Sequence, residues 1–186
     1  TKARIVAAAW RLFYEQGYED TTVEEIIELS GTSKGSFYHY FDGKDALLST
    51  LSSLFDEKYE ELTGLLTPEM TAMEQLLFLN RELFHMIEDS ISLDLLARLY
   101  STQLTTNGEK HLLDHNRIYY KLLRKIIAKG QAEGQLSSRS NVNEMVKLYA
   151  LCERALLYDW CLCAGEYALT EYSAKVLPGF LSSFLP

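Results

Sequence analysis

The sequence predicts an all-α protein of about nine helices, with a small N-terminal unit over residues 1–46 and a helical bundle over 47–186. Apolar residues recur at helical spacing, as in the first predicted helix, where they occupy i, i+3, i+4, i+7 and i+8 from Ile5. Helix-start signals and glycines divide the chain into segments of helical length, and no stretch shows the alternation typical of a strand.

Composition limits the class of protein. The 186 residues are 47% hydrophobic, which is enough for a sizeable core. No run of 18 apolar residues predicts a membrane span, and the first residues lack the apolar block of a secretory signal. Three cysteines, all late in the chain, give no disulfide framework. We therefore expect a cytoplasmic protein.

The first three helices are predicted over residues 3–16, 22–31 and 33–41. Gly17 ends the first, and Thr21 and Thr22 each have a Glu three residues on, so either can open a capping box. Gly31 suits a left-handed helix end, and Ser33 can cap the third helix. Two short helices around a tight turn form a helix-turn-helix, whose second helix enters a DNA major groove. Its expected core is Ile5, Phe13, Val23, Ile26, Ile27, Phe37 and Phe41.

The string Ser33-Lys34-Gly35-Ser36-Phe37-Tyr38-His39-Tyr40-Phe41, followed by Lys44-Asp45-Ala46-Leu47, closely resembles the recognition helix of TetR-type (TetR/AcrR) bacterial regulators. The resemblance covers roughly the first 55 residues and implies a DNA-binding head. In relatives the matching positions contact base edges or phosphates. Carried over, the DNA-binding residues are Thr22, Ser33, Lys34, Gly35, Ser36, Tyr38, His39, Tyr40 and Lys44.

Charge is the main objection to this interpretation. The whole chain has a net charge of −8, and residues 1–47 hold five Lys or Arg against eight Asp or Glu. A DNA reader of this composition must concentrate its cations locally. They are Lys34 and Lys44 at the two ends of the recognition segment, with Lys2, Arg4 and Arg11 on the first helix.

The remaining helices are expected to be longer. A connector helix should start near Asp42 or Gly43 and end before Pro68, which we expect to start the next helix. Pro178-Gly179 predicts a kink or break in the last helix. The expected helices after the connector cover 68–88, 93–105 (ending at Asn107-Gly108), 109–133, 141–164 and 170–185.

The helix over 141–164 is apolar nearly all round and needs burial on two sides. The resemblance implies a homodimer through a four-helix bundle of the last two helices of each subunit. Two recognition helices about 34 Å apart then read a palindromic operator. The candidate dimer stripe is Leu148, Cys152, Ala155, Asp159 and Leu162.

Relatives of this type enclose a small, largely apolar effector in the bundle. Glu153 is the most informative candidate, because a carboxylate on an aromatic stripe is costly unless it is paired or exposed. We expect it to pair with an arginine such as Arg98 or Arg124, or to meet a cationic or hydroxylated ligand. The candidate ligand-binding residues are Phe84, Tyr100, Asn116, Tyr120, Tyr149, Glu153 and Trp160.

No catalytic string or phosphate loop is present, and we expect no catalytic residue, cofactor or metal. His111 and His115 stand four apart on a predicted helix, a spacing that can hold a metal, but two solvated histidines are the simpler interpretation.

The predicted function is a ligand-responsive DNA-binding regulator, a repressor released from its operator by the effector. Two alternatives stay open: a TetR-like protein that acts through a protein partner without reading DNA, and a small-ligand carrier or enzyme. The sequence identifies neither the effector nor the operator.

Overall fold

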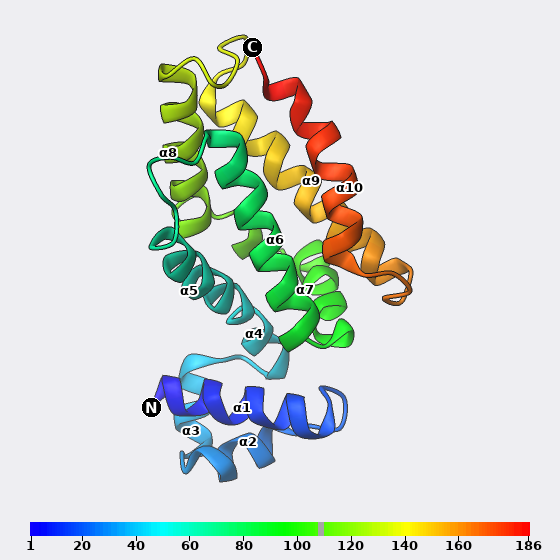
Figure 1. Cartoon of the computed structure of the whole chain (residues 1–186). Helices are drawn as coiled ribbons and strands as arrows, with labels where there is room; N and C mark the ends of the chain where they lie inside the picture. The colour runs from blue at the N-terminus through cyan, green and yellow to red at the C-terminus, as the bar shows by residue number, and fades with distance from the viewer. Residues whose placement is uncertain (108–109) are drawn as a thin grey trace. The chain divides into compact units, whose positions relative to one another are not determined.

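The computed structural model describes residues 1–107 and 110–186, and every regular element in those residues is helical (Figure 1). The predicted all-α class is confirmed. No helix in the described residues is long and apolar enough to cross a membrane. The α-helices are α1 (Lys2–Gln16), α2 (Val23–Ser30), α3 (Lys34–Tyr40), α4 (Lys44–Leu48), α5 (Leu51–Thr63), α6 (Ala72–Ser90), α7 (Leu93–Thr105), α8 (Ile118–Ala132), α9 (Val142–Leu162) and α10 (Leu169–Leu181). Two 3₁₀ turns, His111–Leu113 and Ser182–Phe184, complete the described structure.

The chain folds as two compact units. The first comprises Thr1–Leu54 and Asp94–His111, and the second comprises Phe55–Leu93 and Leu112–Pro186. The N-terminal helices therefore share a unit with most of α7, a segment far away in sequence.

In the first unit α1, α2 and α3 pack on one another, as a helix-turn-helix requires. The Thr22 hydroxyl accepts a hydrogen bond from the Glu25 amide, and the Glu25 carboxylate accepts one from the Thr22 amide, so the predicted capping box forms at Thr22. Gly31 ends α2 in the left-handed conformation (φ 60°, ψ 36°), and Ser33 caps α3. Five of the seven predicted core residues are buried: Ile5, Phe13, Ile26, Phe37 and Phe41. Val23 and Ile27 are half-buried.

The predicted single connector helix is wrong, because the chain turns at Ser49 and Thr50 between α4 and α5. The Ser49 and Thr50 hydroxyls donate to the carbonyl oxygens of Ala46 and Leu47, three residues earlier. Such bonds compete with the helical ladder. Thr50 also accepts a hydrogen bond of 2.8 Å from the Trp10 indole of α1, which anchors the turn within its unit.

The expected helix start at Pro68 is also wrong. Residues 67–70 form a turn, and α6 begins at Ala72 with Thr71 as its N-cap. Thr71 and Glu74 make a second capping box, which satisfies more of the unpaired amides of the first turn than Pro68 can. Thr71-Ala72-Met73-Glu74 carries this signal in the sequence.

The second unit is built on four long helices. α6 packs against α8 and α10, and α9 packs against the same two helices. Gly130 of α8 marks a close approach, since a Cβ there would lie 2.6 Å from the Cβ of Ala72 and 2.8 Å from Cδ1 of Leu136. The Arg117 guanidinium forms two hydrogen bonds of 3.0 and 3.1 Å with Asp56, joining α5 to the start of α8.

Two further boundaries differ from expectation. α8 begins at Ile118 rather than near residue 109, because His111–Leu113 form a 3₁₀ turn before it. Gly108 and Glu109, where the sequence predicted the end of one helix and the start of the next, lie outside the described residues. The expected break at Pro178 is wrong, since α10 continues through it to Leu181. Asn141 caps α9 as predicted, accepting from the Glu144 amide.

Candidate DNA-binding head and ligand-binding bundle

The short helix α3 separates its core side chains from its surface side chains. Phe37 is fully buried and Phe41 nearly so, whereas Tyr38 and Tyr40 are 46% and 42% exposed. The buried phenylalanines hold α3 on the rest of the head, and the exposed face is left for a partner. The residues of that face are Ser33, Lys34, Gly35, Tyr38, His39 and Tyr40, with Ser36 half-buried beside them.

The N-terminal end of α3 carries the polar groups suited to base edges. The Ser33 hydroxyl accepts a hydrogen bond from the Ser36 amide and lies 3.0 Å from the Ser36 hydroxyl. Lys34 has its ammonium 3.9 Å from a Glu24 carboxylate oxygen, and both side chains are about three-quarters exposed. An ion pair this exposed contributes little, so Lys34 can leave Glu24 for an acceptor on DNA.

Lys44, predicted to bind phosphate, is already engaged. Its ammonium donates to the carbonyl oxygens of Tyr18 and Glu19 over 2.7 and 3.2 Å. It also lies 4.4 Å from the centre of the Tyr18 ring. The Thr22 hydroxyl is likewise used within the capping box. In this structure both residues shape the head.

Tyr18 is the site residue that sequence reasoning missed. It is buried, its hydroxyl donates to Asp45, and Lys44 and the guanidinium of Arg98 both lie over its ring. Arg98 of α7 also pairs with Glu19 and Asp94. Burial, followed by the hydrogen bond to Asp45, raises the pKa of Tyr18 well above its ordinary value. No local pattern could have predicted this cluster, because Arg98 is remote in sequence.

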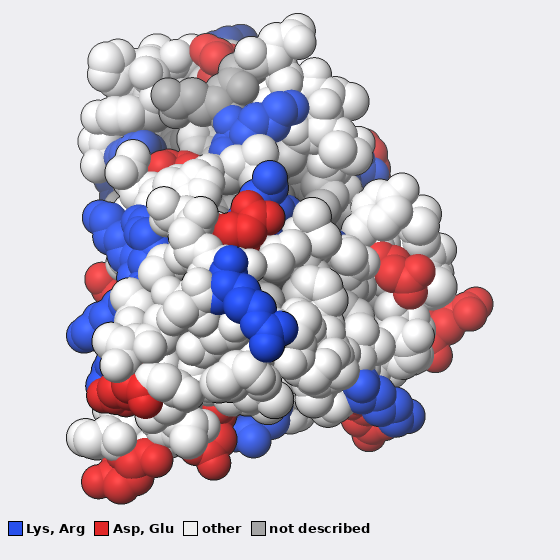
Figure 2. Space-filling view, turned by 90° about the horizontal axis from the view of Figure 1, so that it is seen from above, with Lys and Arg blue, Asp and Glu red and all other residues white. Residues whose placement is uncertain are grey.

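Charge on the described surface is mixed. The face in Figure 2 shows acidic and basic side chains interspersed rather than separated by sign. Residues 1–47, which include the head, hold five Lys or Arg against eight Asp or Glu, so the head offers a few placed cations and helix N-termini, with no broad basic coat.

The structure separates the residues of the predicted dimer stripe on α9. Cys152 is buried inside its own subunit, whereas Asp159 is exposed and accepts a hydrogen bond from the Tyr167 hydroxyl. The exposed apolar side chains instead follow a heptad-like spacing along α9. They are Leu151, Ala155, Tyr158 and Leu162, with Leu148 half-buried at the start. Tyr172 is exposed on α10, which packs against α9.

Glu153 lies at the centre of a buried polar network in the second unit. Its carboxylate accepts hydrogen bonds from the Asn80 amide (2.9 Å) and the Tyr119 hydroxyl (2.6 Å). The Asn80 carbonyl in turn accepts one from Ser173 (2.6 Å). Burial raises the pKa of Glu153 above its ordinary value, although the hydrogen bonds oppose that shift. The expected pairing with Arg98 or Arg124 is wrong, because neutral donors from α6 and α8 satisfy the carboxylate instead.

The other predicted ligand residues differ in burial, and Tyr120 is the one that lines a groove described below. Phe84, Tyr149 and Trp160 are buried, and the Tyr149 hydroxyl donates to the Leu76 carbonyl oxygen. Tyr100 is half-buried on α7, and Asn116 is exposed in the turn before α8.

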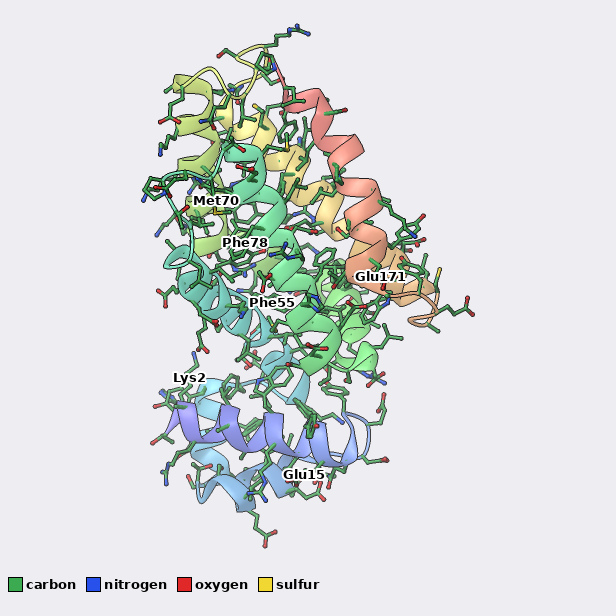
Figure 3. All side chains as sticks on the ribbon, viewed as in Figure 1. Lys2, Glu15, Phe55, Met70, Phe78 and Glu171 are labelled. Atoms are coloured by element: carbon green, nitrogen blue, oxygen red, sulfur yellow. The ribbon has the colours of Figure 1, made fainter. Side chains whose placement is uncertain are left out.

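Two of the grooves on the second unit have the size of a ligand site. One, of about 620 Å³, lies between α6 and α10, with Asn80 and Ser173 among its lining residues. Met70 and Phe78, labelled in Figure 3, belong to its apolar part. The other, of about 770 Å³, lies between residues 113–120 and the first turns of α9, and it includes Tyr120.

The metal hypothesis for His111 and His115 receives no support from the described residues. His111 lies in the 3₁₀ turn and His115 in the turn that follows, so they do not share a helix face. No group of three potential metal ligands occurs in the described part of the chain. All three cysteines are free, and burial raises the pKa of the Cys152 thiol to about 11.

A three-helix head that presents a recognition helix, in a chain that is otherwise a helical bundle, defines a helix-turn-helix regulator. Residues 5–51 match the model for bacterial regulatory proteins of the tetR family. Residues 5–51 therefore form a DNA-binding head of the tetR type, and the resemblance drawn from Ser33–Leu47 is confirmed.

Curated relatives match mainly over the head. The chain is 37% identical to the transcriptional regulator TtgR of Pseudomonas putida over 62 residues, which is 33% of this chain and 30% of that protein. It is 37% identical to QacR of Staphylococcus aureus over 60 residues, which is 32% of each chain. These matches span about a third of the relatives' length. The fatty acid metabolism regulator of Bacillus subtilis is 23% identical over 94% of this chain and 90% of its own.

Solved structures show that the fold extends through the bundle. FadR from Thermus thermophilus, solved in complex with lauroyl-CoA, has a TM-score of 0.75 at 24% identity, covering 100% of this chain and 96% of that one. FadR from Bacillus subtilis, solved with stearoyl-CoA, has a TM-score of 0.72 at 23% identity, covering 99% and 100%. At this level of identity the likeness shows the fold alone.

Proposed function

We propose that the protein is a homodimeric transcriptional repressor that binds a palindromic operator and releases it when a small molecule binds the helical bundle. The exposed face of α3 carries the proposal. Phe37 and Phe41 fix the helix, while Lys34 and Tyr38 are exposed and Ser36 is half-buried beside them. A protein of this kind acts in the cytoplasm, where its operator is.

Within that face, Lys34 and Ser36 are the proposed base-contacting residues, and Gly35 lets the backbone approach. Lysine suits the two acceptors of guanine, and serine can meet either kind of base. Tyr38, His39 and Tyr40 are proposed to contact phosphate or thymine methyl groups. Ser33, Thr22 and Lys44 are proposed to act through the geometry of the head, because their polar atoms hold its caps and its α1–α2 loop.

The apolar stripe of α9 and the neighbouring α10 are the proposed dimer interface. Leu151, Tyr158 and Leu162 are 48%, 48% and 67% exposed, and a contiguous apolar surface of this kind marks an interaction site. Dimerisation supplies the second recognition helix that a palindromic operator requires.

The effector response needs a ligand that binds the DNA-competent and DNA-free states with different affinity. Because solved neighbours of this fold were crystallised with lauroyl-CoA and stearoyl-CoA, acyl-CoA thioesters are the first effectors to test. Operator must then weaken effector binding by the same factor as effector weakens operator binding.

The test is binding of a fluorescent duplex, taken from the region upstream of the protein's own gene, at two salt concentrations. We expect affinity to fall with salt and one palindromic segment to retain binding when competitor DNA is added. Absence of binding at low salt would contradict the repressor. It would favour a regulator that acts through a protein partner, the alternative that the acidic N-terminal segment supports.

A further inference from the structure

The groove between residues 113–120 and α9 has the size of a ligand site. Its volume is about 770 Å³, within the range of typical small-molecule pockets. One side is formed by Leu113, His115 and Tyr120, and the other by the cap and first four turns of α9. All of these residues belong to the second compact unit.

Cations outnumber carboxylates along this groove. Lys147 and Arg154 line it, and neither forms an ion pair with a carboxylate within residues 1–107 and 110–186. The one acidic residue in the lining is Glu144, in the first turn of α9. The groove therefore carries an excess of positive charge in a protein whose net charge is −8. Because the chain is acidic overall, a surface of average composition would carry more carboxylates than cations.

Arg154, one of the two cations of the α9 wall, is held in place by hydrogen bonds within the protein. Nη1 of Arg154 donates to the Tyr120 hydroxyl over 3.2 Å, and that hydroxyl donates to the Leu112 carbonyl oxygen over 2.8 Å. One hydrogen bond uses only one of the five donors of a guanidinium. Arg154 therefore keeps donors for a carboxylate or phosphate, which it can bind through two parallel hydrogen bonds.

The opposite wall is aromatic and also fixed. The ring of Tyr120 stacks on that of His115, with centroids 4.4 Å apart and planes 29° from parallel. Arg124 donates to the His115 carbonyl oxygen over 2.8 Å, which ties down the turn that carries this histidine. Leu113 adds apolar surface to this wall, and Val142 and Ala150 add it to the wall that α9 forms. Preorganised walls reduce the entropy lost when a ligand binds.

We propose that this groove binds a small organic anion, with its carboxylate or phosphate on Arg154 and Lys147 and its apolar part along Tyr120, Leu113 and Val142. The site gives the effector of the proposed repressor a chemical class, and it rests on the proposed function only for that regulatory role. Binding itself can be measured without DNA.

The first experiment compares the charge of the ligand at constant chain length. Isothermal titration of the full chain with octanoate, octyl phosphate and octylammonium separates the anion from its apolar tail. We expect the two anions to bind and to weaken as salt is raised, and octylammonium to show no binding. A preference between octanoate and octyl phosphate distinguishes a carboxylate source from a phosphate source. Failure of both anions to bind, or equal binding of octylammonium, would overturn the proposal.

The second experiment tests whether the anion binds at Lys147 and Arg154. Lys147→Glu and Arg154→Gln should each weaken the better anion about tenfold or more, because each removes a charge-assisted contact. Lys125→Glu is the matched control, since this exposed lysine of α8 lines a different groove and should leave affinity unchanged. Circular dichroism checks that each variant is folded. Equal affinity in all variants, or an equal loss in the control, would overturn the proposed location.

Failure of this site is distinguishable from failure of the repressor. Operator binding by the wild-type protein without ligand tests the repressor alone. If the protein binds operator but no anion, the proposed anion site is wrong and the proposed repressor function stands. If the protein binds an anion through Arg154 but binds no DNA, the proposed anion site stands and the proposed repressor function is wrong.

Discussion

The hydroxyl of Tyr119 donates a hydrogen bond of 2.6 Å to Oε2 of Glu153, and both side chains are buried in the second unit. Asn80 satisfies the other carboxylate oxygen and is itself held by Ser173. The network thus joins α6, α8, α9 and α10 through one acidic group. A buried carboxylate is tolerated only where such donors replace water.

Removing a hydrogen-bond donor to the buried Glu153 carboxylate should lower the stability of the folded protein. Tyr119→Phe deletes one hydrogen bond and leaves Oε2 of Glu153 buried without it. We expect the free energy of unfolding to fall by about 2 kcal/mol, measured by urea denaturation at neutral pH. Tyr14→Phe is the control, because Tyr14 is 83% exposed and should be neutral. Equal stability of Tyr119→Phe and wild type would contradict the role of the network.

Glu153 should also make stability depend on pH. Its pKa is raised in the folded protein above the ordinary carboxyl value of 4.5 because it is buried. The unfolded chain therefore releases this proton at lower pH than the folded chain does. The stability that this group contributes is present at low pH and is lost as pH rises from 4.5 through the raised pKa.

Glu153→Gln isolates this effect, since glutamine does not titrate. Urea denaturation across the acid-to-neutral range should show the variant gaining stability relative to wild type as pH rises. A difference between the two proteins that stays constant with pH would show that the pKa of Glu153 is not raised by folding.

The two lysines of the recognition segment should behave differently. Lys34→Ala removes an exposed cation from α3 and should weaken operator binding by about 1–3 kcal/mol without changing stability. Lys44→Ala removes two hydrogen bonds to the Tyr18 and Glu19 carbonyl oxygens and should lower the free energy of unfolding by about 1 kcal/mol. Fluorescence anisotropy and thermal melting separate the two effects. Unchanged stability of Lys44→Ala, with a smaller salt slope, would restore its assignment as a phosphate contact.

The α9 stripe predicts where dimerisation can be broken. Tyr158→Arg places a charge among Leu151, Ala155 and Leu162, and we expect monomers at concentrations where wild type is dimeric. Leu104→Arg is the control, because Leu104 is 72% exposed but lies on α7. Analytical ultracentrifugation over a range of concentrations measures both. If Tyr158→Arg is still dimeric, the dimer interface does not lie on this stripe of α9.

Two helical glycines should respond oppositely to alanine. At Gly130 a Cβ would lie 2.6 Å from that of Ala72, so Gly130→Ala should destabilise by about 1–3 kcal/mol. At Gly179 nothing lies within 4 Å of the added atom. Gly179→Ala should therefore stabilise by about 0.5–1 kcal/mol through helix propensity. Thermal denaturation of both variants measures the sign, and a stable Gly130→Ala would show that α6 and α8 are less tightly packed than described.

The head could be predicted from the sequence in detail because its signals are local. The Thr22–Glu25 box, the left-handed Gly31 and the Ser33 cap each act within a few residues, and all three form as expected. Predictions failed where two local signals competed. Pro68 suggested a helix start, but Thr71 and Glu74 offered the first turn of α6 more hydrogen bonds. The Ser49-Thr50 pair interrupted an apolar pattern that looked continuous.

By itself the sequence determined the all-α class, the helix-turn-helix and the tetR type of the head, because helix periodicity, caps and the recognition string are properties of neighbouring residues. Tertiary structure alone decided which partners the isolated charges have. Glu153 is bonded to Asn80 and Tyr119 rather than to an arginine, and Lys44 is bonded to carbonyl oxygens. These partners are many residues away in sequence, and burial of Glu153 in the core is what makes its donors necessary.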